Sequence, residues 1–258
     1  MTSSLPLSGR DILITRSVEQ SVSFAQYIEK QGGIAHAVPL LAFRSNRDRK
    51  EKVTMDHIFQ YDWMIFTSKN AVDYFQQTLS HYSLSLSNLQ AKVGAVGSKT
   101  ASYLQSKGIK VDFCPQNFTA EDFAYEFVQR NMKPNKVLIP KGSLAGQSIQ
   151  TIFHAHHICC DELIVYCTYT PENSLDELQH LLTSKKIDAI TFTSSSAVRF
   201  FMKALQKRGL SIPETVYACI GPKTKATAES LGLVVQISPN IYTIEEMMKA
   251  LVNYYQHT

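Results

Sequence analysis

An internal repeat constrains the fold of this chain more than any other feature of its sequence. Residues 67–72 (Thr-Ser-Lys-Asn-Ala-Val) recur as residues 193–198 (Thr-Ser-Ser-Ser-Ala-Val), 126 positions later. Residues 97–100 (Gly-Ser-Lys-Thr) recur as residues 221–224 (Gly-Pro-Lys-Thr), 124 positions later. Motifs in one order at a nearly constant spacing indicate a duplicated unit within the 258 residues. We therefore expect two similar domains, and not a solenoid, which would contain many shorter copies.

Short apolar or β-branched runs alternate with amphipathic stretches along the whole chain. Strands are expected at residues 11–15, 34–41, 62–66, 92–96, 109–113, 136–139, 161–168, 188–192, 215–220 and 233–237. A capping-box spacing opens two of the intervening helices, at Ser17 with Gln20 and at Thr243 with Glu246. Strict alternation of strands and helices is typical of parallel sheets with helices on both faces. The sequence therefore predicts an α/β fold with two similar parallel-sheet domains.

The composition is that of a globular protein with neither a membrane nor a nucleic acid as partner. Apolar residues make up 44% of the chain and charged residues 19%, which is too apolar for a disordered chain. The formal net charge of +4 comes without the concentrated basic face of a nucleic-acid-binding protein. No run approaches the roughly 18 apolar residues of a membrane helix, and no secretory signal is legible. The five cysteines are an odd number, so we expect reduced thiols and a cytoplasmic protein.

Each repeated motif stands where an expected strand ends and a helix begins. In open α/β sheets ligands bind at that edge, and free backbone N–H groups at a helix start attract anions. A single motif of this kind is more often a helix cap or a tight turn. Four motifs in two related halves favour a shared ligand-binding cleft. The candidate binding residues are Thr67, Ser68, Gly97, Lys99, Thr100, Ser194, Ser195, Gly221 and Thr224.

The sequence lacks the familiar cofactor and catalytic motifs. It contains neither the glycine-rich loop of a nucleoside triphosphate site, nor a dinucleotide fingerprint after its first strand, nor a serine-hydrolase elbow. Three histidines and two cysteines gather within residues 154–160, but without the paired, loop-separated spacing of a zinc site. We interpret that cluster as structural and predict no metal site and no cofactor.

Taken in order, the short motifs resemble the uroporphyrinogen-III synthase family. The resemblance runs from about residue 11 to about residue 251, nearly the whole chain. Each motif is weak alone, and their order together with the duplication makes the set specific. The motifs are residues 14–16 (Ile-Thr-Arg), 66–72, 96–100, 118–121 (Phe-Thr-Ala-Glu), 165–168 (Val-Tyr-Cys-Thr), 192–194 and 220–224.

The resemblance implies two flavodoxin-like domains joined by a two-stranded linker. Residues 34–43 and 161–170 would be the strands that cross between the domains. It also implies that the first strand and helix join the C-terminal half of the chain. The domains would then comprise residues 1–38 with 168–258, and residues 39–167. The repeat by itself does not show this exchange.

The family converts the linear tetrapyrrole hydroxymethylbilane into uroporphyrinogen III. Water is lost, the chain cyclises and the terminal pyrrole ring is inverted, so the resemblance implies a cofactor-independent lyase. The many carboxylates of the substrate suit helix N-termini, hydroxyls and a few cations. Tyr166 occupies the position of the family's tyrosine at the leaving hydroxyl, and Arg16 that of its arginine after the first strand. We also expect a monomer that contacts the preceding enzyme of the pathway only transiently.

Three positions depart from the pattern of the family. Lys141 precedes Gly142 where the family usually has Arg-Gly; as a candidate binding residue, Lys141 keeps the charge but loses the two-pronged carboxylate geometry. Gly146 stands where a second Arg is frequent, and His157 where Gly commonly ends a helix. Two other functions stay open from the residues alone: a non-catalytic α/β protein that binds a polyanion, and a flavodoxin-like flavin protein.

Overall fold

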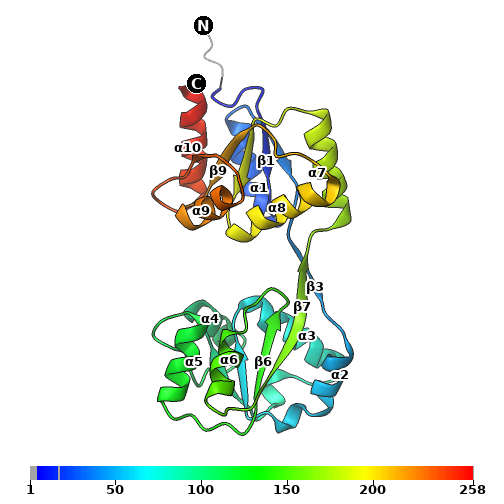
Figure 1. Cartoon of the computed structure of the whole chain (residues 1–258), viewed down its shortest axis with the longest axis vertical. Coiled ribbons are helices and arrows are strands. Elements are labelled where there is room, and N and C mark those ends of the chain that lie inside the picture. Colours follow the sequence, from blue (N-terminus) through cyan, green and yellow to red (C-terminus); the bar gives the residue numbers. More distant parts are fainter. Residues whose placement is uncertain (1–4, 17, 258) are drawn as a thin grey trace. The chain divides into compact units, whose positions relative to one another are not determined.

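The computed structural model describes residues 5–16 and 18–257 (Figure 1). The capping pair expected at Ser17 and Gln20 lies outside the described residues, because it includes Ser17. Contacts divide the chain into two compact units. The first unit runs to Ala42 and resumes at Tyr169, and the second unit is Phe43–Thr168. The chain therefore passes twice from one unit to the other.

The described part of the first unit contains a five-stranded sheet. Its strands are β1 (Asp11–Ile14), β2 (Ile34–Ala37), β8 (Ala189–Phe192), β9 (Val216–Cys219) and β10 (Val235–Ile237). They lie in the order β10-β9-β8-β1-β2, and every neighbouring pair is parallel. Numbered along this unit alone, the order is 2-1-3-4-5, that of flavodoxin-like sheets. The predicted α/β class with parallel sheets is confirmed.

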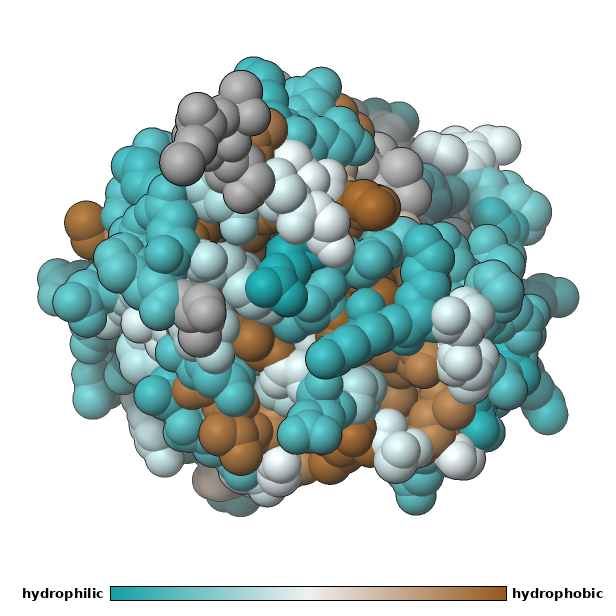
Figure 2. Space-filling model, turned by 90° about the horizontal axis from the view of Figure 1, so that it is seen from above, coloured by the Kyte–Doolittle hydropathy of each residue, from teal (hydrophilic) through white to brown (hydrophobic). Residues whose placement is uncertain are grey.

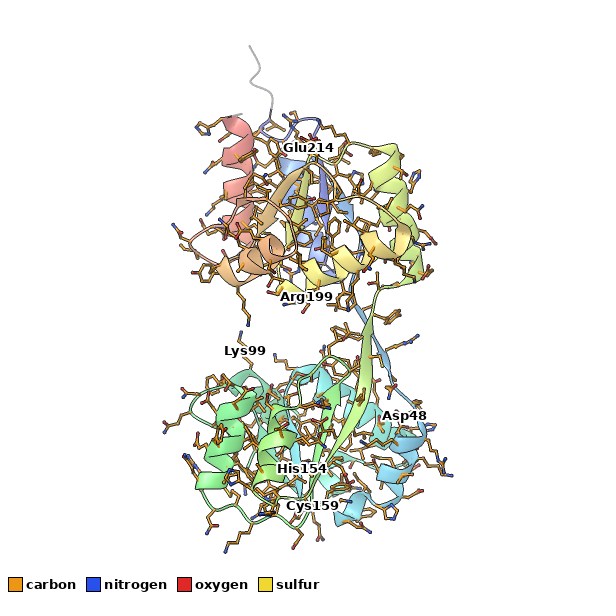
Figure 3. The ribbon with its side chains drawn as sticks, viewed as in Figure 1. Asp48, Lys99, His154, Cys159, Arg199 and Glu214 are labelled. Atoms are coloured by element: carbon orange, nitrogen blue, oxygen red, sulfur yellow. The ribbon has the colours of Figure 1, made fainter. Side chains whose placement is uncertain are left out.

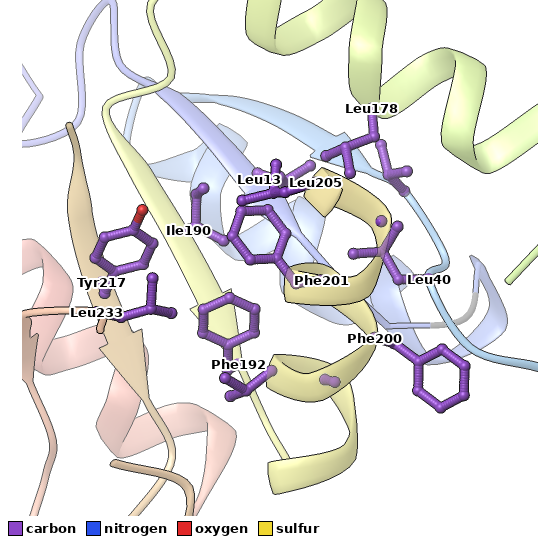
Figure 4. Close-up of a cluster of buried hydrophobic side chains, with 14 of the residues drawn as sticks. Leu13, Leu40, Leu178, Ile190, Phe192, Phe200, Phe201, Leu205, Tyr217 and Leu233 are labelled. Carbon is purple, nitrogen blue, oxygen red and sulfur yellow. The ribbon is translucent and has the colours of Figure 1, made fainter. Parts of the chain in front are cut away.

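Helices cover both faces of this sheet, because its central strands are apolar on both sides. The helices are α1 (Val18–Lys30), α7 (Glu172–Ser184), α8 (Ser195–Arg208), α9 (Pro222–Ser230) and α10 (Ile244–Gln256). Side chains alternate across a strand, so Leu13 packs toward α7 and α8 while its neighbours Ile12 and Ile14 pack toward α1 and α10. The sheet thus has a hydrophobic core on each face. The core on the side of α7 and α8 contains Phe192 and Phe201, whose ring centroids lie 5.3 Å apart (Figure 4).

The second unit is built on the same plan. Its strands are β3 (Ala42–Ser45), β4 (Trp63–Phe66), β5 (Lys92–Ala95), β6 (Val137–Gly142) and β7 (Cys160–Tyr169), in the order β3-β7-β6-β4-β5. The repeat equates β4 with β8 and β5 with β9, so the central pair β4–β6 corresponds to β8–β1. Its helices are α2 (Arg49–Asp56), α3 (Lys69–His81), α4 (Ser98–Ser106), α5 (Ala120–Gln129) and α6 (Ser148–Ala155), with short 3₁₀ turns at Ile58–Gln60 and Leu86–Asn88.

Two expected strands are much shorter than predicted, whereas most of the others differ by one or two residues at their ends. Residues 109–113 form only an isolated bridge, in which Phe113 pairs with Gly94. The backbone N–H of Val93 donates to the carboxylate of Asp112 at 3.0 Å. A longer strand at residues 109–113 would need that N–H for its hydrogen bonds to β5. The strand expected at residues 34–41 ends at Ala37, and β3 begins only at Ala42. Pro39 lies between them and has no N–H to donate.

A third strand is longer than predicted, with a consequence for the site. Residues 140–142 were expected to follow the strand, but β6 continues to Gly142 because β7 pairs with it along its whole length. Pro140 is tolerated there because β4 pairs with β6 only at Val137 and Leu138. Lys141 is therefore a strand residue and not a loop residue.

Polar and charged residues cover most of the face in Figure 2, with hydrophobic residues exposed between them. Single exposed apolar residues are usual on a globular protein. Within the described ranges, no helix is long and apolar enough to cross a bilayer.

Candidate active site

The carboxyl edge of the first unit's sheet has a topological switch point between β1 and β8. β1 leads to β2 on one side and β8 leads to β9 on the other, which is where ligands bind in open α/β sheets. Buried threonines tie the two strands there. Thr15 Oγ1 donates to the carbonyl of Thr191 at 2.9 Å, and Thr191 Oγ1 donates to the carbonyl of Leu13 at 3.1 Å. Arg16 and Ser194 follow directly, so both stand at this edge.

The Thr-Ser motifs begin helices of nearly identical geometry in the two units. Ser68 caps α3 with φ −161° and ψ 160°, and Ser194 caps α8 with φ −161° and ψ 154°. Each hydroxyl accepts the backbone N–H three residues later at 3.1 Å. Thr67 precedes the first cap and is half-buried. The capping interpretation is thus correct for Ser68 and Ser194, and it leaves their function at the edge open.

The glycine motifs begin helices in a different way. Gly97 and Gly221 are the N-caps of α4 and α9, and neither helix has a side-chain hydrogen bond at its cap. The first backbone N–H groups of a helix have no partner within it. At α4 and α9 no capping side chain occupies them, so these helix starts can bind a carboxylate. At α9 the donors begin with Lys223, because Pro222 at the first position has no N–H. Ser195 joins α8 to α9, since its hydroxyl donates to the carbonyl of Lys223 at 3.2 Å.

The remaining residues of the glycine motifs differ in exposure. Lys99 is exposed, and Figure 3 shows its side chain extending away from the start of α4. Among the described residues, no ion pair involves Lys99. Thr100 and Thr224 are buried in the first turns of α4 and α9. Lys99 can therefore reach a ligand directly, while the two threonines support the helix start from inside.

Lys141 is buried and already has partners. Its Nζ donates to Glu162 Oε1 at 2.7 Å and to the carbonyl of Gly146 at 2.6 Å. The lysine and glutamate side chains are only 5% and 12% exposed. The charge of Lys141 is thus neutralised between β6 and β7, and its contact with Gly146 fixes the loop that follows β6.

Tyr166 lies across the end of β6. In the register of β6 and β7 it stands opposite Gly142, and a Cβ atom added to that glycine would lie 2.6 Å from the tyrosine hydroxyl. The ring stacks on Tyr74 with centroids 5.1 Å apart and meets Phe43 edge-on at 5.4 Å. Within the part of the chain that the structure describes, no hydrogen bond occupies the hydroxyl of Tyr166. Its ring is therefore fixed while its hydroxyl can donate to a ligand.

Arg16 is partly buried at its edge. Burial lowers the pKa of its guanidinium, but a guanidinium stays protonated in proteins. The first unit thus holds a permanent cation beside the switch point.

The model of the family described as uroporphyrinogen-III synthase HemD matches residues 22–249. The chain belongs to the uroporphyrinogen-III synthase family. It is 28% identical over 262 residues to the synthase of Synechococcus elongatus, with 98% of each chain covered. It is 27% identical over 247 residues to that of Chlorobaculum parvum, with 94% of this chain and 98% of the relative covered.

Solved structures of the family share the fold. The uroporphyrinogen-III synthetase of Helicobacter pylori has a TM-score of 0.62 at 19% identity and covers 95% of this chain and 99% of its own. A mutant uroporphyrinogen III synthase of Thermus thermophilus has a TM-score of 0.66 at 14% identity, with 97% and 100% covered. These structures confirm the fold, and the match to the family model confirms the family predicted from the order of the motifs.

Sequence reasoning missed the aromatic residues around the site. Tyr74 and Phe43 hold the ring of Tyr166, yet they lie on α3 and β3, far from it in sequence. Phe118 belongs to the motif of residues 118–121, but its correspondence with Tyr242 was missed, although the threonines that follow the two residues match at the spacing of the repeat. Thr119 caps α5 and Thr243 caps α10, each accepting the N–H three residues later.

The histidine and cysteine cluster lies at the other end of the second unit's sheet. His154 and Cys159 are exposed, while Cys160 is buried in β7. His157 ends the turn after α6 with φ +58°, a conformation that favours glycine. All five cysteines fall in the described ranges and are free thiols. In the same ranges, no three histidine, cysteine, aspartate or glutamate residues are grouped to hold a metal.

We expect chelation to leave the protein unchanged. A structural metal contributes to folding free energy, so its removal lowers the melting temperature. Dialysis against EDTA should change neither the melting temperature nor the rate of product formation. Stoichiometric zinc in the purified protein, lost together with activity on chelation, would contradict the structural interpretation of residues 154–160.

Proposed function

We propose that this chain converts hydroxymethylbilane to uroporphyrinogen III, with inversion of the terminal pyrrole ring and loss of one water, and without a cofactor. Membership of the family supports the reaction. The observation that supports the proposal for this chain is the position of Tyr166. Its ring is fixed by stacking on Tyr74, and its hydroxyl lies beside the carboxyl end of β6, where it can donate to a ligand.

Tyr166 assists the first chemical step. Its phenol donates a hydrogen bond to the terminal hydroxyl of the substrate as the C–O bond breaks, and the hydroxyl leaves as water after gaining a proton. The cation that remains on the pyrrole carbon can be stabilised by an aromatic face. The cationic methylene carbon first bonds to the substituted α-carbon of the terminal pyrrole, which gives a spiro intermediate. The older bond from that α-carbon to the neighbouring methylene then breaks, and this methylene bonds to the free α-carbon of the now inverted ring, which releases a proton. The product is the substrate less one water.

The carboxyl edges of the sheets supply the contacts to the substrate's carboxylates. In the first unit these are Arg16 and the start of α9 at Gly221. In the second unit they are the start of α4 at Gly97 and the exposed Lys99. Lys141 has a supporting role, because Glu162 already neutralises its charge. Charged donors make the strongest hydrogen bonds to carboxylates, and a guanidinium can make two at once, so we expect Arg16 to be the strongest single contact.

One assay tests the function directly. Freshly prepared hydroxymethylbilane is supplied to the purified protein, and isomers I and III are resolved after oxidation. The substrate cyclises spontaneously to isomer I without ring inversion. An excess of isomer III is expected, whereas isomer I at the spontaneous rate would leave a binding protein without chemistry. A cytoplasmic location, a monomeric state and a transient contact with the enzyme that supplies hydroxymethylbilane stay predictions.

Arg16→Ala is expected to weaken substrate binding while the protein stays folded. A hydrogen bond to a charged group contributes about 1.5–3 kcal/mol, so the Michaelis constant should rise while the melting temperature changes little. Arg10→Ala is the matched control, because Arg10 precedes the same strand at the opposite edge, where it pairs with Asp188 at 2.9 Å. An unchanged Michaelis constant in folded Arg16→Ala would exclude a binding role.

A further inference from the structure

Two aromatic side chains stand exposed at equivalent positions of the repeat. Phe118 is 56% exposed and Tyr242 is 61% exposed. They are 124 positions apart, the spacing of the glycine motifs. Each directly precedes the threonine that caps a helix, α5 in the second unit and α10 in the first. Single exposed aromatic residues are common on proteins. An exposed aromatic residue at the same position of both copies indicates a shared role.

Each aromatic residue also lies against the glycine that begins the neighbouring helix. A Cβ atom added to Gly221 would lie 2.9 Å from Cδ1 and 3.0 Å from Cγ of Tyr242. One added to Gly97 would lie 3.7 Å from Cβ of Phe118. Only the contact at Gly221 is close enough to require the absence of a side chain, whereas the contact at Gly97 is an ordinary one with the Cβ atom of Phe118. More than half of the surface of each aromatic residue is left to solvent.

Helix stability alone does not account for this placement. A residue just before a helix cap often packs on the fourth helical residue, as a hydrophobic staple. Those residues here are Phe123 and Met247, both fully buried. The ring of Phe123 packs with Phe113 at 5.0 Å and with Phe127 at 5.9 Å instead. A staple would bury Phe118 and Tyr242, and the structure leaves them exposed.

Phe118 and Tyr242 both lie beside groups that can bind the carboxylates of the substrate. Each stands at the carboxyl edge of its own sheet, beside the uncapped start of α4 or α9. Lys99 and Lys223, both exposed, occupy the second position of those helices. Each edge by itself therefore combines an apolar aromatic surface with amide and ammonium donors. That combination fits a planar pyrrole ring that carries carboxylate side chains.

We propose that Phe118 and Tyr242 are substrate-contacting residues, each of which packs on a pyrrole ring while the adjacent helix start binds a carboxylate of that ring. This inference rests on the proposed function. It makes the duplication itself part of substrate recognition, because each unit provides the same pair of features.

The test uses Phe118→Ala and Tyr242→Ala in the full-length protein, with the Michaelis constant for hydroxymethylbilane and the melting temperature as readouts. An aromatic pair contributes enough to change binding about two- to tenfold, so each variant should raise the Michaelis constant by that factor with little change in melting temperature. The double variant should show about the product of the two effects. Tyr242→Phe keeps the ring and should restore wild-type binding.

Matched controls come from the opposite edges of the two sheets. Phe59 precedes β4 and Val234 precedes β10, and each is 72% exposed. Phe59→Ala and Val234→Ala should leave the Michaelis constant unchanged. If the wild-type protein makes no isomer III, the proposed function fails. If the wild-type protein makes isomer III and both aromatic variants have the wild-type Michaelis constant, this inference is wrong. That conclusion holds whether or not the melting temperatures of the variants fall.

Discussion

Tyr166→Phe is expected to slow the formation of isomer III and to let isomer I accumulate. General acid assistance contributes roughly 10²–10⁴-fold to a rate, and the loss here should lie at the lower end because water can donate in place of the phenol. The ring, and with it the stacking on Tyr74 at 5.1 Å, is kept, so stability and much of the binding should be unchanged.

The measurement is the rate of each isomer under single-turnover conditions, with Tyr125→Phe as control. Tyr125 lies on α5 and is 52% exposed, so loss of its hydroxyl should alter neither rate nor isomer ratio. Isomer III made by Tyr166→Phe at the wild-type rate would reduce Tyr166 to a packing residue.

Gly142→Ala is expected to inactivate the enzyme by displacing Tyr166. The added Cβ would lie 2.6 Å from Cε2 and from the hydroxyl of the tyrosine, closer than real Cβ contacts allow. Either the ring leaves its stack with Tyr74 and Phe43, or the β6–β7 pair shifts. Overpacking of this kind costs about 1–3 kcal/mol of stability, and a displaced hydroxyl loses the assistance that it gives to the leaving group.

Gly146→Ala is the matched control, because the nearest atom to a Cβ there is Ser148 Oγ at 4.0 Å. It should retain wild-type activity. A double-mutant cycle then decides the cause: in a Tyr166→Ala background, Gly142→Ala should add little to the loss of rate. A further large loss in that background, or full activity of Gly142→Ala alone, would contradict the displacement of Tyr166.

Local features of the sequence are sufficient to predict most of the elements and the edge on which the site residues stand. Ser68, Ser194, Thr119 and Thr243 all cap helices, because capping depends on a hydroxyl and on backbone N–H groups two or three residues away. The repeat is likewise visible in the sequence, because each copy contains the same motifs whatever the other copy contacts. The α/β class follows from these local signals.

Strand ends depended on partners that local sequence does not reveal. β6 continues through Pro140 to Gly142 because β7 pairs with it over that length. Residues 109–113 form a single bridge because the N–H of Val93 donates to the side chain of Asp112. In the same way, Lys141 has the residue type of a carboxylate ligand. Only the pairing of β6 with β7 brings Glu162 to it and removes its charge from the surface.

The sequence by itself determined the α/β class, the duplication, the helix caps and the family, since each is written in short patterns and their order along the chain. The family resemblance implies that the first strand joins the C-terminal half, but only the tertiary structure decided that it pairs with β8, 177 residues away. Only the tertiary structure decided, too, that Tyr166 lies against Gly142 between Tyr74 and Phe43. An apolar strand such as β1 fits the centre of either sheet. Its place is set by specific long-range contacts, such as the hydrogen bonds from Thr15 to Thr191 and from Thr191 to Leu13, which form only once the chain has folded.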